Sequence, residues 1–180
     1  MDFAEIKETW DCTKEEWEDW EWQLKNSIVN AQQLKDRFDI SEAEAEDIKE
    51  AADIFPMAIT PYYASLIDFE DEMCPIRMQA IPRQAELQKS RVDMEDPLHE
   101  DADSPVPGVT HRYPDRVLLL VTNKCSMFCR HCTRKRKVGD SNSIVDLEQV
   151  KEGIEYIRNT PEVRDVLISG GDPLLLDTDM

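Results

Sequence analysis

Two apolar runs constrain the fold of the second half of the chain. Residues 117–121 read Val-Leu-Leu-Leu-Val, and a second, largely apolar run over residues 163–169 ends at a pair of glycines. Such runs are typical of strands covered on both faces of a parallel sheet. Between them, residues 147–158 carry apolar side chains at helical spacing, with Asp146 placed to cap the helix. The order strand, loop, helix, strand predicts a βαβ unit and therefore an α/β fold, with parallel strands joined by a right-handed crossover.

Three cysteines follow the first run at the spacing C-x3-C-x2-C: Cys125, Cys129 and Cys132. Thiolates are soft ligands suited to iron–sulfur clusters, zinc and Cu(I). An ordinary electron-transfer cluster uses four cysteines, so three would hold a [4Fe–4S] cube with one iron open to a further ligand. Zinc, with His131 or His111 as fourth ligand, and free reduced thiols are the alternatives. The spacing favours the open cluster, because structural zinc sites usually combine two cysteine-rich halves.

A second candidate site follows the second apolar run, at Ser169-Gly-Gly-Asp172. Glycines allow a close approach of the backbone to a ligand. In parallel α/β folds, ligands bind at the carboxyl ends of strands, and both this segment and the cysteine loop follow such ends. We therefore expect them to face one pocket, with a plain tight turn as the alternative for the glycines.

Basic residues near these segments suggest anion binding. Arg134 comes two residues after the last cysteine of the motif, and a guanidinium in the pocket could clamp a carboxylate with two parallel N–H bonds. The neighbouring residues 135–137 are predicted to be solvated. Arg112 and Arg116 flank Tyr113, a set suited to phosphate, with surface salt bridges to acids such as Asp115 as the alternative.

The first 110 residues differ in composition from the rest. The net charge of the chain is −18, and all of the excess lies before residue 111. Such an acidic surface repels nucleic-acid backbones. No apolar run approaches the ~20 residues that span a membrane, and the start of the chain does not resemble a secretory signal. The five cysteines, an odd number with three close together, indicate a reducing cytoplasm rather than a disulfide framework.

Helices are predicted throughout this acidic region. Thr13 and Glu16 form a capping box before an amphipathic helix over residues 14–30. Its apolar stripe is expected to contain Trp17, Trp20, Leu24 and Ile28, with Trp22 off the stripe.

Further helices are predicted over residues 42–54, capped by Ser41, and over residues 83–93. Residues 69–82 read as a loop, because they contain two prolines and no clear helical period. Cys12 and Cys74, which stand alone, are expected to be small, partly buried apolar residues.

Together these motifs resemble the radical S-adenosylmethionine superfamily, and within it the lysine 2,3-aminomutase family. The resemblance rests on the cysteine motif with its following Thr-Arg, on Ser169-Gly-Gly-Asp, and on segments spread over nearly the whole chain. These segments are Trp17-Glu-Asp-Trp-Glu-Trp-Gln, Met57-Ala-Ile-Thr-Pro-Tyr-Tyr, Asp96-Pro-Leu-His-Glu-Asp, Ser104-Pro-Val-Pro-Gly and His111-Arg-Tyr-Pro-Asp-Arg.

The resemblance implies ligands for two cofactors. Three irons of a [4Fe–4S] cluster would be bound by Cys125, Cys129 and Cys132, and S-adenosyl-L-methionine would bind the fourth iron. His131 corresponds to a position near the adenine. The strand-end motif at the methionyl amine corresponds to Ser169, Gly170, Gly171 and Asp172.

The resemblance also implies a substrate site and a reaction. Arg134 corresponds to the arginine that binds the α-carboxylate of the substrate, and Arg112, Tyr113 and Arg116 correspond to residues around pyridoxal 5′-phosphate. Reductive cleavage of S-adenosylmethionine would give a 5′-deoxyadenosyl radical that takes a hydrogen atom from the β-carbon. The α-amino group of L-lysine would then move to that carbon, giving β-lysine. The cofactors supply this chemistry and the protein positions them.

Partners and alternatives follow from the same resemblance. A cytoplasmic isomerase of this kind needs a one-electron reductant such as flavodoxin or ferredoxin, and it is expected to be a homo-oligomer that binds neither nucleic acid nor membrane. Glutamate or arginine 2,3-aminomutase is the alternative among enzymes. A non-catalytic product, in which a helical interaction domain carries a cluster or zinc loop, is the alternative from another class.

The implied organisation has three parts. Residues 1–94 would form an acidic helical domain, residues 95–110 a Pro-rich connector, and residues 111–180 the start of the radical S-adenosylmethionine core. That core would hold the first βαβ units of an incomplete (βα) partial barrel. We expect the chain to be an N-terminal fragment that is inactive alone, because the Schiff-base lysine of relatives lies beyond it and a lone βαβ unit leaves much apolar surface exposed.

Overall fold

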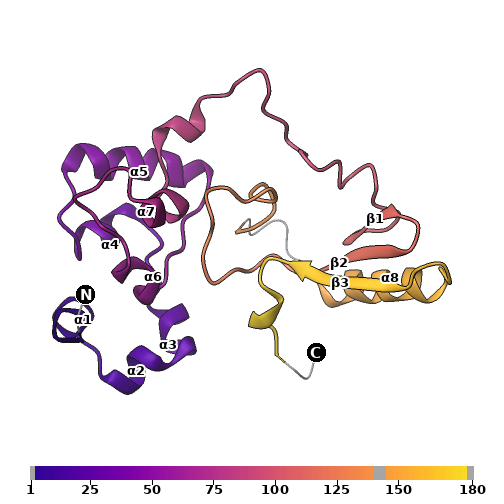
Figure 1. The fold of residues 1–180 in the computed structure, drawn as a ribbon, viewed down its shortest axis with the longest axis horizontal. Coiled ribbons are helices and arrows are strands. Elements are labelled where there is room, and N and C mark those ends of the chain that lie inside the picture. The colour runs from indigo at the N-terminus through magenta and orange to yellow at the C-terminus, as the bar shows by residue number, and fades with distance from the viewer. Residues whose placement is uncertain (1–2, 140–144, 178–180) are drawn as a thin grey trace. The chain divides into compact units, whose positions relative to one another are not determined.

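The structure, a computed structural model, describes residues 3–139 and 145–177 and divides into two compact units. The helical unit comprises residues 1–90 and 126–132, and the sheet unit comprises residues 91–125 and 133–180 (Figure 1). The cysteine motif crosses this division, since its first cysteine belongs to the sheet unit and the other two to the helical unit. The domain boundaries inferred from the sequence stay a prediction.

Short helices build the helical unit. They are α1 (Phe3–Trp10), α2 (Lys14–Glu18), α3 (Trp20–Lys25), α4 (Ala31–Lys35), α5 (Glu42–Ile54), α6 (Pro61–Ser65), α7 (Pro75–Ala80) and the 3₁₀-helix η1 (Gln84–Leu87). Side-chain caps fix several of their starts. Thr13 and Glu16 form the predicted capping box, and the Ser41 hydroxyl accepts from the backbone N–H of Glu44 at 3.1 Å. The predicted helix over residues 42–54 is confirmed.

The predicted helix over residues 14–30 is wrong, because Asp19 divides it. Asp19 has extended backbone angles, and its carboxylate accepts from the N–H of Glu21 at 2.9 Å, which starts α3 afresh. The break shifts the helical phase, so Trp22 packs against the core while Trp20 is 58% exposed. The predicted roles of these two tryptophans are therefore reversed.

Two further helix predictions in this unit need correction. Residues 69–82 contain α7, which begins at Pro75 directly after Cys74. Proline is favoured at the first position of a helix, because its missing N–H would have no partner there. The helix predicted over residues 83–93 is limited to η1.

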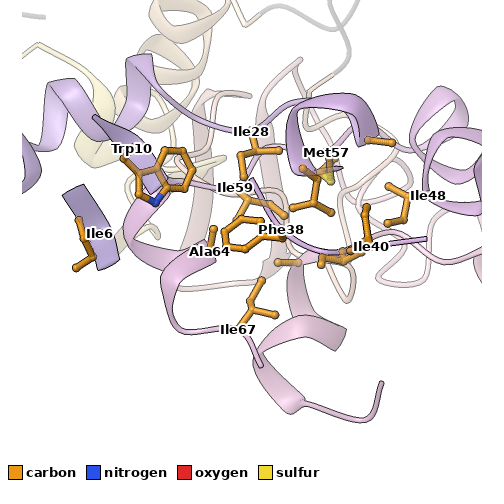
Figure 2. Close-up of a cluster of buried hydrophobic side chains, with 14 of the residues drawn as sticks. Ile6, Trp10, Ile28, Phe38, Ile40, Ile48, Met57, Ile59, Ala64 and Ile67 are labelled. Carbon is orange, nitrogen blue, oxygen red and sulfur yellow. The ribbon is translucent and has the colours of Figure 1, made fainter. Parts of the chain in front are cut away.

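Apolar side chains from α1, α4, α5, α6 and their connections form one core in the helical unit (Figure 2). Ile28 and Ile59 are fully buried in it, and their backbones exchange hydrogen bonds of 2.8 and 3.0 Å. Cys12 and Cys74 are also buried. Met127, from the cysteine loop, packs against the same core. Residues 126–132 of the loop are therefore an integral part of the helical unit.

The sheet unit contains β1 (Val109–Tyr113), β2 (Arg116–Thr122) and β3 (Asp165–Gly170), in the order β1-β2-β3. The β2–β3 pair is parallel, and α8 (Leu147–Arg158) lies between these strands in the chain, which confirms the predicted βαβ order and the Asp146 cap. β1 pairs antiparallel with β2. β1 and β2 therefore form a β-hairpin with its turn at residues 114–115, and β1 was not predicted from the sequence. The 3₁₀-helix η2 (Pro173–Leu175) follows β3.

α8 packs on the sheet through Gly153. A Cβ at this position would lie 2.6 Å from Leu119 Cδ1 and 3.0 Å from Val109 Cγ2, so the helix approaches the strands closely because it has a glycine here. Tyr156 and Ile157 pack against the same strand residues, whereas Ile154 on the same helix is 45% exposed.

β3 is the outer strand among the strands described, and its apolar side chains are uncovered. Val166, Leu167 and Ile168 are all exposed, although the composition is that of a strand covered on both faces. No helix in the described ranges is both long enough and apolar enough to cross a membrane.

Candidate functional site

The three cysteines of the motif are in no disulfide and have intermediate exposure. Cys129 and Cys132 are joined by a turn in which the N–H of Cys132 donates to the carbonyl of Cys129 at 3.2 Å. Partly exposed, closely spaced thiols suit the ligation of a soft metal cluster. Within residues 3–139 and 145–177, no group of three or more His, Cys, Asp or Glu is arranged to hold a metal ion. The cluster assignment of the three cysteines therefore stays a prediction.

Tyr63, in α6, lies close to Cys129. Burial raises the pKa of the Tyr63 phenol, and charge on the Cys129 and Cys74 thiols raises it further. A neutral phenol therefore borders this cysteine at physiological pH. The sequence gives no local signal for this neighbour, because 66 residues separate Tyr63 from Cys129.

The Gly-Gly-Asp segment lies against the end of β2. The N–H of Gly171 donates to the Thr122 carbonyl at 2.7 Å, and the N–H of Asp172 donates to the Lys124 carbonyl at 2.6 Å. A Cβ on Gly171 would lie 2.0 Å from that Lys124 oxygen, so this approach requires glycine. Gly170 has φ +133°, a conformation that side chains rarely adopt. The segment is thus held beside the residue that precedes Cys125.

Arg134, the predicted carboxylate clamp, forms a two-point ion pair with Glu100. Its Nε donates to Oε2 at 3.0 Å and its Nη2 donates to Oε1 at 2.5 Å, and the Glu100 side chain is buried. Glu100 lies in the segment predicted to be a connector, and the pair fixes the orientation of the guanidinium. Sequence reasoning missed Glu100, because a carboxylate in an acidic stretch gives no local signal of such a partner.

Residues 135–137 were predicted to be solvated, but two of them form ion pairs. Arg136 pairs with Asp96 and Asp101, and Lys137 also pairs with Asp101. The hydrogen bond from Arg136, with that from Lys137, lowers the pKa of Asp101 to about 2. These ion pairs tie the stretch after the cysteine motif to the Pro-rich segment.

The hairpin residues Arg112, Tyr113 and Arg116 lie at the opposite end of the strands from the Gly-Gly-Asp segment. Arg112 and Tyr113 end β1 and Arg116 begins β2, whereas Gly170 ends β3 beside the last residues of β2. Six residue steps along β2 correspond to about 20 Å. Arg116 donates to Asp115 at 2.8 Å, so its observed partner is the surface carboxylate considered as the alternative. Within the sheet unit these residues do not lie near the Gly-Gly-Asp segment, and their assignment to pyridoxal phosphate stays a prediction.

The two histidines considered as zinc ligands differ in environment. His111 Nδ1 lies 2.6 Å from the Tyr156 hydroxyl in the sheet unit, so this nitrogen has a hydrogen-bond partner. His131, between Cys129 and Cys132, is exposed.

The comparisons to known proteins match the part of the chain that contains the cysteine motif and the Gly-Gly-Asp segment. Residues 119–179 match the Radical SAM superfamily, and this range includes the last four residues of β2, the cysteine motif and the Gly-Gly-Asp segment. The chain is 56% identical over 164 residues to L-lysine 2,3-aminomutase of Acetoanaerobium sticklandii, covering 91% of this chain and 40% of that protein. It is 52% identical over 171 residues to the Bacillus subtilis L-lysine 2,3-aminomutase, covering 94% and 36%. Glutamate 2,3-aminomutase of Clostridioides difficile is 43% identical over 167 residues, covering 93% and 39%.

These matches define a radical S-adenosylmethionine protein. Within that superfamily, the chain belongs to the lysine 2,3-aminomutase family. It spans about two fifths of the length of the curated relatives it matches.

Membership of this family implies a [4Fe–4S] cluster, S-adenosylmethionine and pyridoxal phosphate as cofactors. The described residues fit the first two by their chemistry, since the three thiols are partly exposed and, within the sheet unit, the Gly-Gly-Asp segment is bonded to Lys124, the residue before Cys125. The hairpin arginines and tyrosine do not form a phosphate site at that edge.

Proposed function

We propose that the protein to which this chain belongs is an isomerase that moves the α-amino group of L-lysine to the β-carbon. The observation that carries the proposal is the hydrogen bond from Asp172 to Lys124, which places the glycine segment beside the first cysteine of the motif. The choice of L-lysine is supported by identities of 51–56% to five L-lysine 2,3-aminomutases, against 43% to the glutamate enzyme.

In this proposal the cysteine thiolates hold the cluster, which when bound supplies the electron for cleavage of S-adenosylmethionine. Gly170 and Gly171 let the segment pack against the backbone at the end of β2, because a side chain at either position would clash there. Together with Ser169 and Asp172 they are proposed to bind the methionyl moiety. His131, which is exposed, would border the adenine. The orientation of reactants at such an edge is a large part of what the protein contributes to catalysis.

Arg134 is proposed to orient the substrate by its α-carboxylate. The guanidinium has five N–H donors in a fixed fork. Glu100 engages the edge formed by Nε and Nη2 and therefore defines the direction in which the rest of the group points. A charge-assisted bond to the carboxylate would fix the amino acid relative to the cluster.

Three further features belong to the proposal. A one-electron donor, such as flavodoxin or ferredoxin, is needed because the cleavage is reductive. A cytoplasmic location is supported by the five cysteines, an odd number of which three lie within eight residues, with no disulfide among the described ones. Homo-oligomerisation is supported by exposed aromatic side chains on the helical unit, including Trp20 and Tyr62.

The decisive experiment uses the protein expressed from its complete reading frame and purified without oxygen. We expect iron and sulfide in the ratio of a [4Fe–4S] cluster, formation of 5′-deoxyadenosine under reducing conditions, and conversion of L-lysine to β-lysine detected by NMR. Glutamate and arginine are offered in parallel. Conversion of either in preference to lysine would overturn the substrate, and zinc in place of iron would overturn the reaction.

Changing Arg134 to methionine is expected to raise KM for lysine about 10- to 100-fold, because charged hydrogen bonds of ~1.5–3 kcal/mol are lost. Iron content and substrate-free cleavage of S-adenosylmethionine should be unchanged. Arg136→Met is the matched control, since Arg136 pairs with Asp96 and Asp101 instead.

Arg134→Met also leaves Glu100 without this partner in a buried position, which destabilises the protein. The double variant with Glu100→Gln removes the buried charge. An unchanged KM in both variants, or loss of the cluster in both, would contradict the clamp role.

A further inference from the structure

The cysteine loop is fastened to the helical unit by an ion pair inside the motif itself. Arg130, between Cys129 and His131, pairs with Glu86 in η1. We propose that Glu86, through Arg130, is a positioning residue that sets the geometry of Cys129 and Cys132 for cluster binding. This inference rests on the proposed function, since it assumes that these cysteines hold a cluster.

The pair is a two-point contact shielded from water. Arg130 Nε donates to Glu86 Oε1 at 3.1 Å, and Nη2 donates to Oε2 at 2.8 Å. The two side chains are only 7% and 17% exposed. Water screens such a pair less than it screens a surface salt bridge, and the fork geometry orients the arginine as well as binding it.

The remaining edge of the guanidinium binds backbone. Nη1 donates to the Pro56 carbonyl at 3.0 Å, and Nη2 also lies 3.3 Å from the Phe55 carbonyl, beyond the end of α5. One side chain therefore joins the cysteine loop to two separate segments of the helical unit. Lysine could not reproduce this set, because its single ammonium group lacks the planar fork.

The Glu86 carboxylate is also oriented by a hydrogen bond that does not involve Arg130. Its Oε1 accepts from the backbone N–H of Arg83 at 3.1 Å, which fixes the carboxylate at the start of η1. A partner oriented by its own hydrogen bond can hold a neighbouring ligand segment precisely, as outer-shell groups do at metal sites.

The loop backbone is anchored on both sides of Cys129. The N–H of Phe128 donates to the Ala58 carbonyl at 3.1 Å, and the N–H of Arg130 donates to the Gln79 carbonyl at 2.8 Å. The turn from Cys129 to Cys132 thus begins from a fixed position. The ion pair is the side-chain part of this anchorage, so its removal should loosen the turn while the unit stays folded.

The test compares cluster retention in variants of the protein expressed from its complete reading frame. Glu86→Gln removes the charge, Arg130→Met removes the fork, and Arg130→Lys keeps only the charge. Outer-shell changes typically cost about 10- to 100-fold in metal affinity. We therefore expect Glu86→Gln and Arg130→Met to lose iron to a chelator at least about tenfold faster than the parent protein. The rate for Arg130→Lys should lie between that of the parent protein and that of Arg130→Met.

Glu44→Gln is the matched control. Glu44 in α5 pairs with the buried Arg77 in α7, so this change also removes a carboxylate from a shielded arginine of the same unit. Arg77 donates to the Phe69 carbonyl rather than to the cysteine loop. Thermal unfolding of the two variants should be similar, whereas iron loss should accelerate only in Glu86→Gln.

The outcomes separate this inference from the proposed function. A parent protein that binds no iron–sulfur cluster would remove the proposed function itself. A parent that holds the cluster, together with equal iron loss in Glu86→Gln and Glu44→Gln, would overturn the positioning role alone. Rapid iron loss in Glu86→Gln, slowed in Arg130→Lys relative to Arg130→Met, would establish it.

Discussion

Replacing Cys129 by alanine is expected to abolish both the iron–sulfur cluster and the cleavage of S-adenosylmethionine. Two thiolates cannot hold three irons. Cys129 lies in the anchored turn of the helical unit, and the only other described cysteine in that part of the loop is Cys132, which is itself a predicted ligand. The measurements are iron content, the electron paramagnetic resonance signal of the reduced protein, and 5′-deoxyadenosine formed per hour.

Cys12→Ala is the control for this change, because Cys12 is also a cysteine of the helical unit but is isolated and buried. It should cost some thermal stability and keep a full complement of iron. Retained cleavage of S-adenosylmethionine in Cys129→Ala would remove the cluster assignment, and with it the proposed reaction.

Changing Gly171 to alanine is expected to disrupt the Gly-Gly-Asp segment at the end of β3 and to abolish binding of S-adenosylmethionine. The new methyl group would lie 2.0 Å from the carbonyl oxygen of Lys124 and 2.6 Å from its carbonyl carbon. These are backbone atoms, so rotation of a side chain cannot relieve the clash. We expect the segment to separate from the end of β2, which removes the hydrogen bonds that Thr122 and Lys124 accept.

Gly153→Ala is the matched control, since its methyl group meets the flexible ends of Leu119 and Val109. Overpacking of that kind costs ~1–3 kcal/mol. Binding of S-adenosylmethionine, measured by calorimetry, should be lost in Gly171→Ala and kept in Gly153→Ala. Equal binding in the two variants would contradict a cofactor role for this edge.

Local signals in the sequence predicted the parts of the fold that local interactions determine. The parallel pair of β2 and β3, α8 with its Asp146 cap, and α5 all follow from periodicity and capping residues. The break at Asp19 was missed because its neighbours continue a helical pattern on both sides. β1 was missed because its five residues, which pair with β2 through a tight hairpin, lack a strong apolar alternation.

The residues of the candidate site likewise divide into those that the sequence alone indicates and those that only the tertiary structure reveals. The three cysteines and the two glycines are visible in the sequence because their chemistry depends on residue type and spacing. Glu86 and Glu100 are not, since each is one carboxylate among many and its arginine lies 44 or 34 residues further along the chain. Only the tertiary fold distinguishes these two from acids that remain in solvent.

The discontinuity of the helical unit also constrains the order of events during synthesis. Met127 and Arg130 complete contacts with segments made much earlier, yet β1 and β2 are translated before them. The helical unit therefore cannot finish folding until the ribosome has released residue 132. At that moment the apolar residues of β2 have emerged without α8 or β3, so the nascent chain passes through a stage in which one strand awaits its parallel partner. Unpaired apolar strands of this kind are binding sites for chaperones and starting points for aggregation.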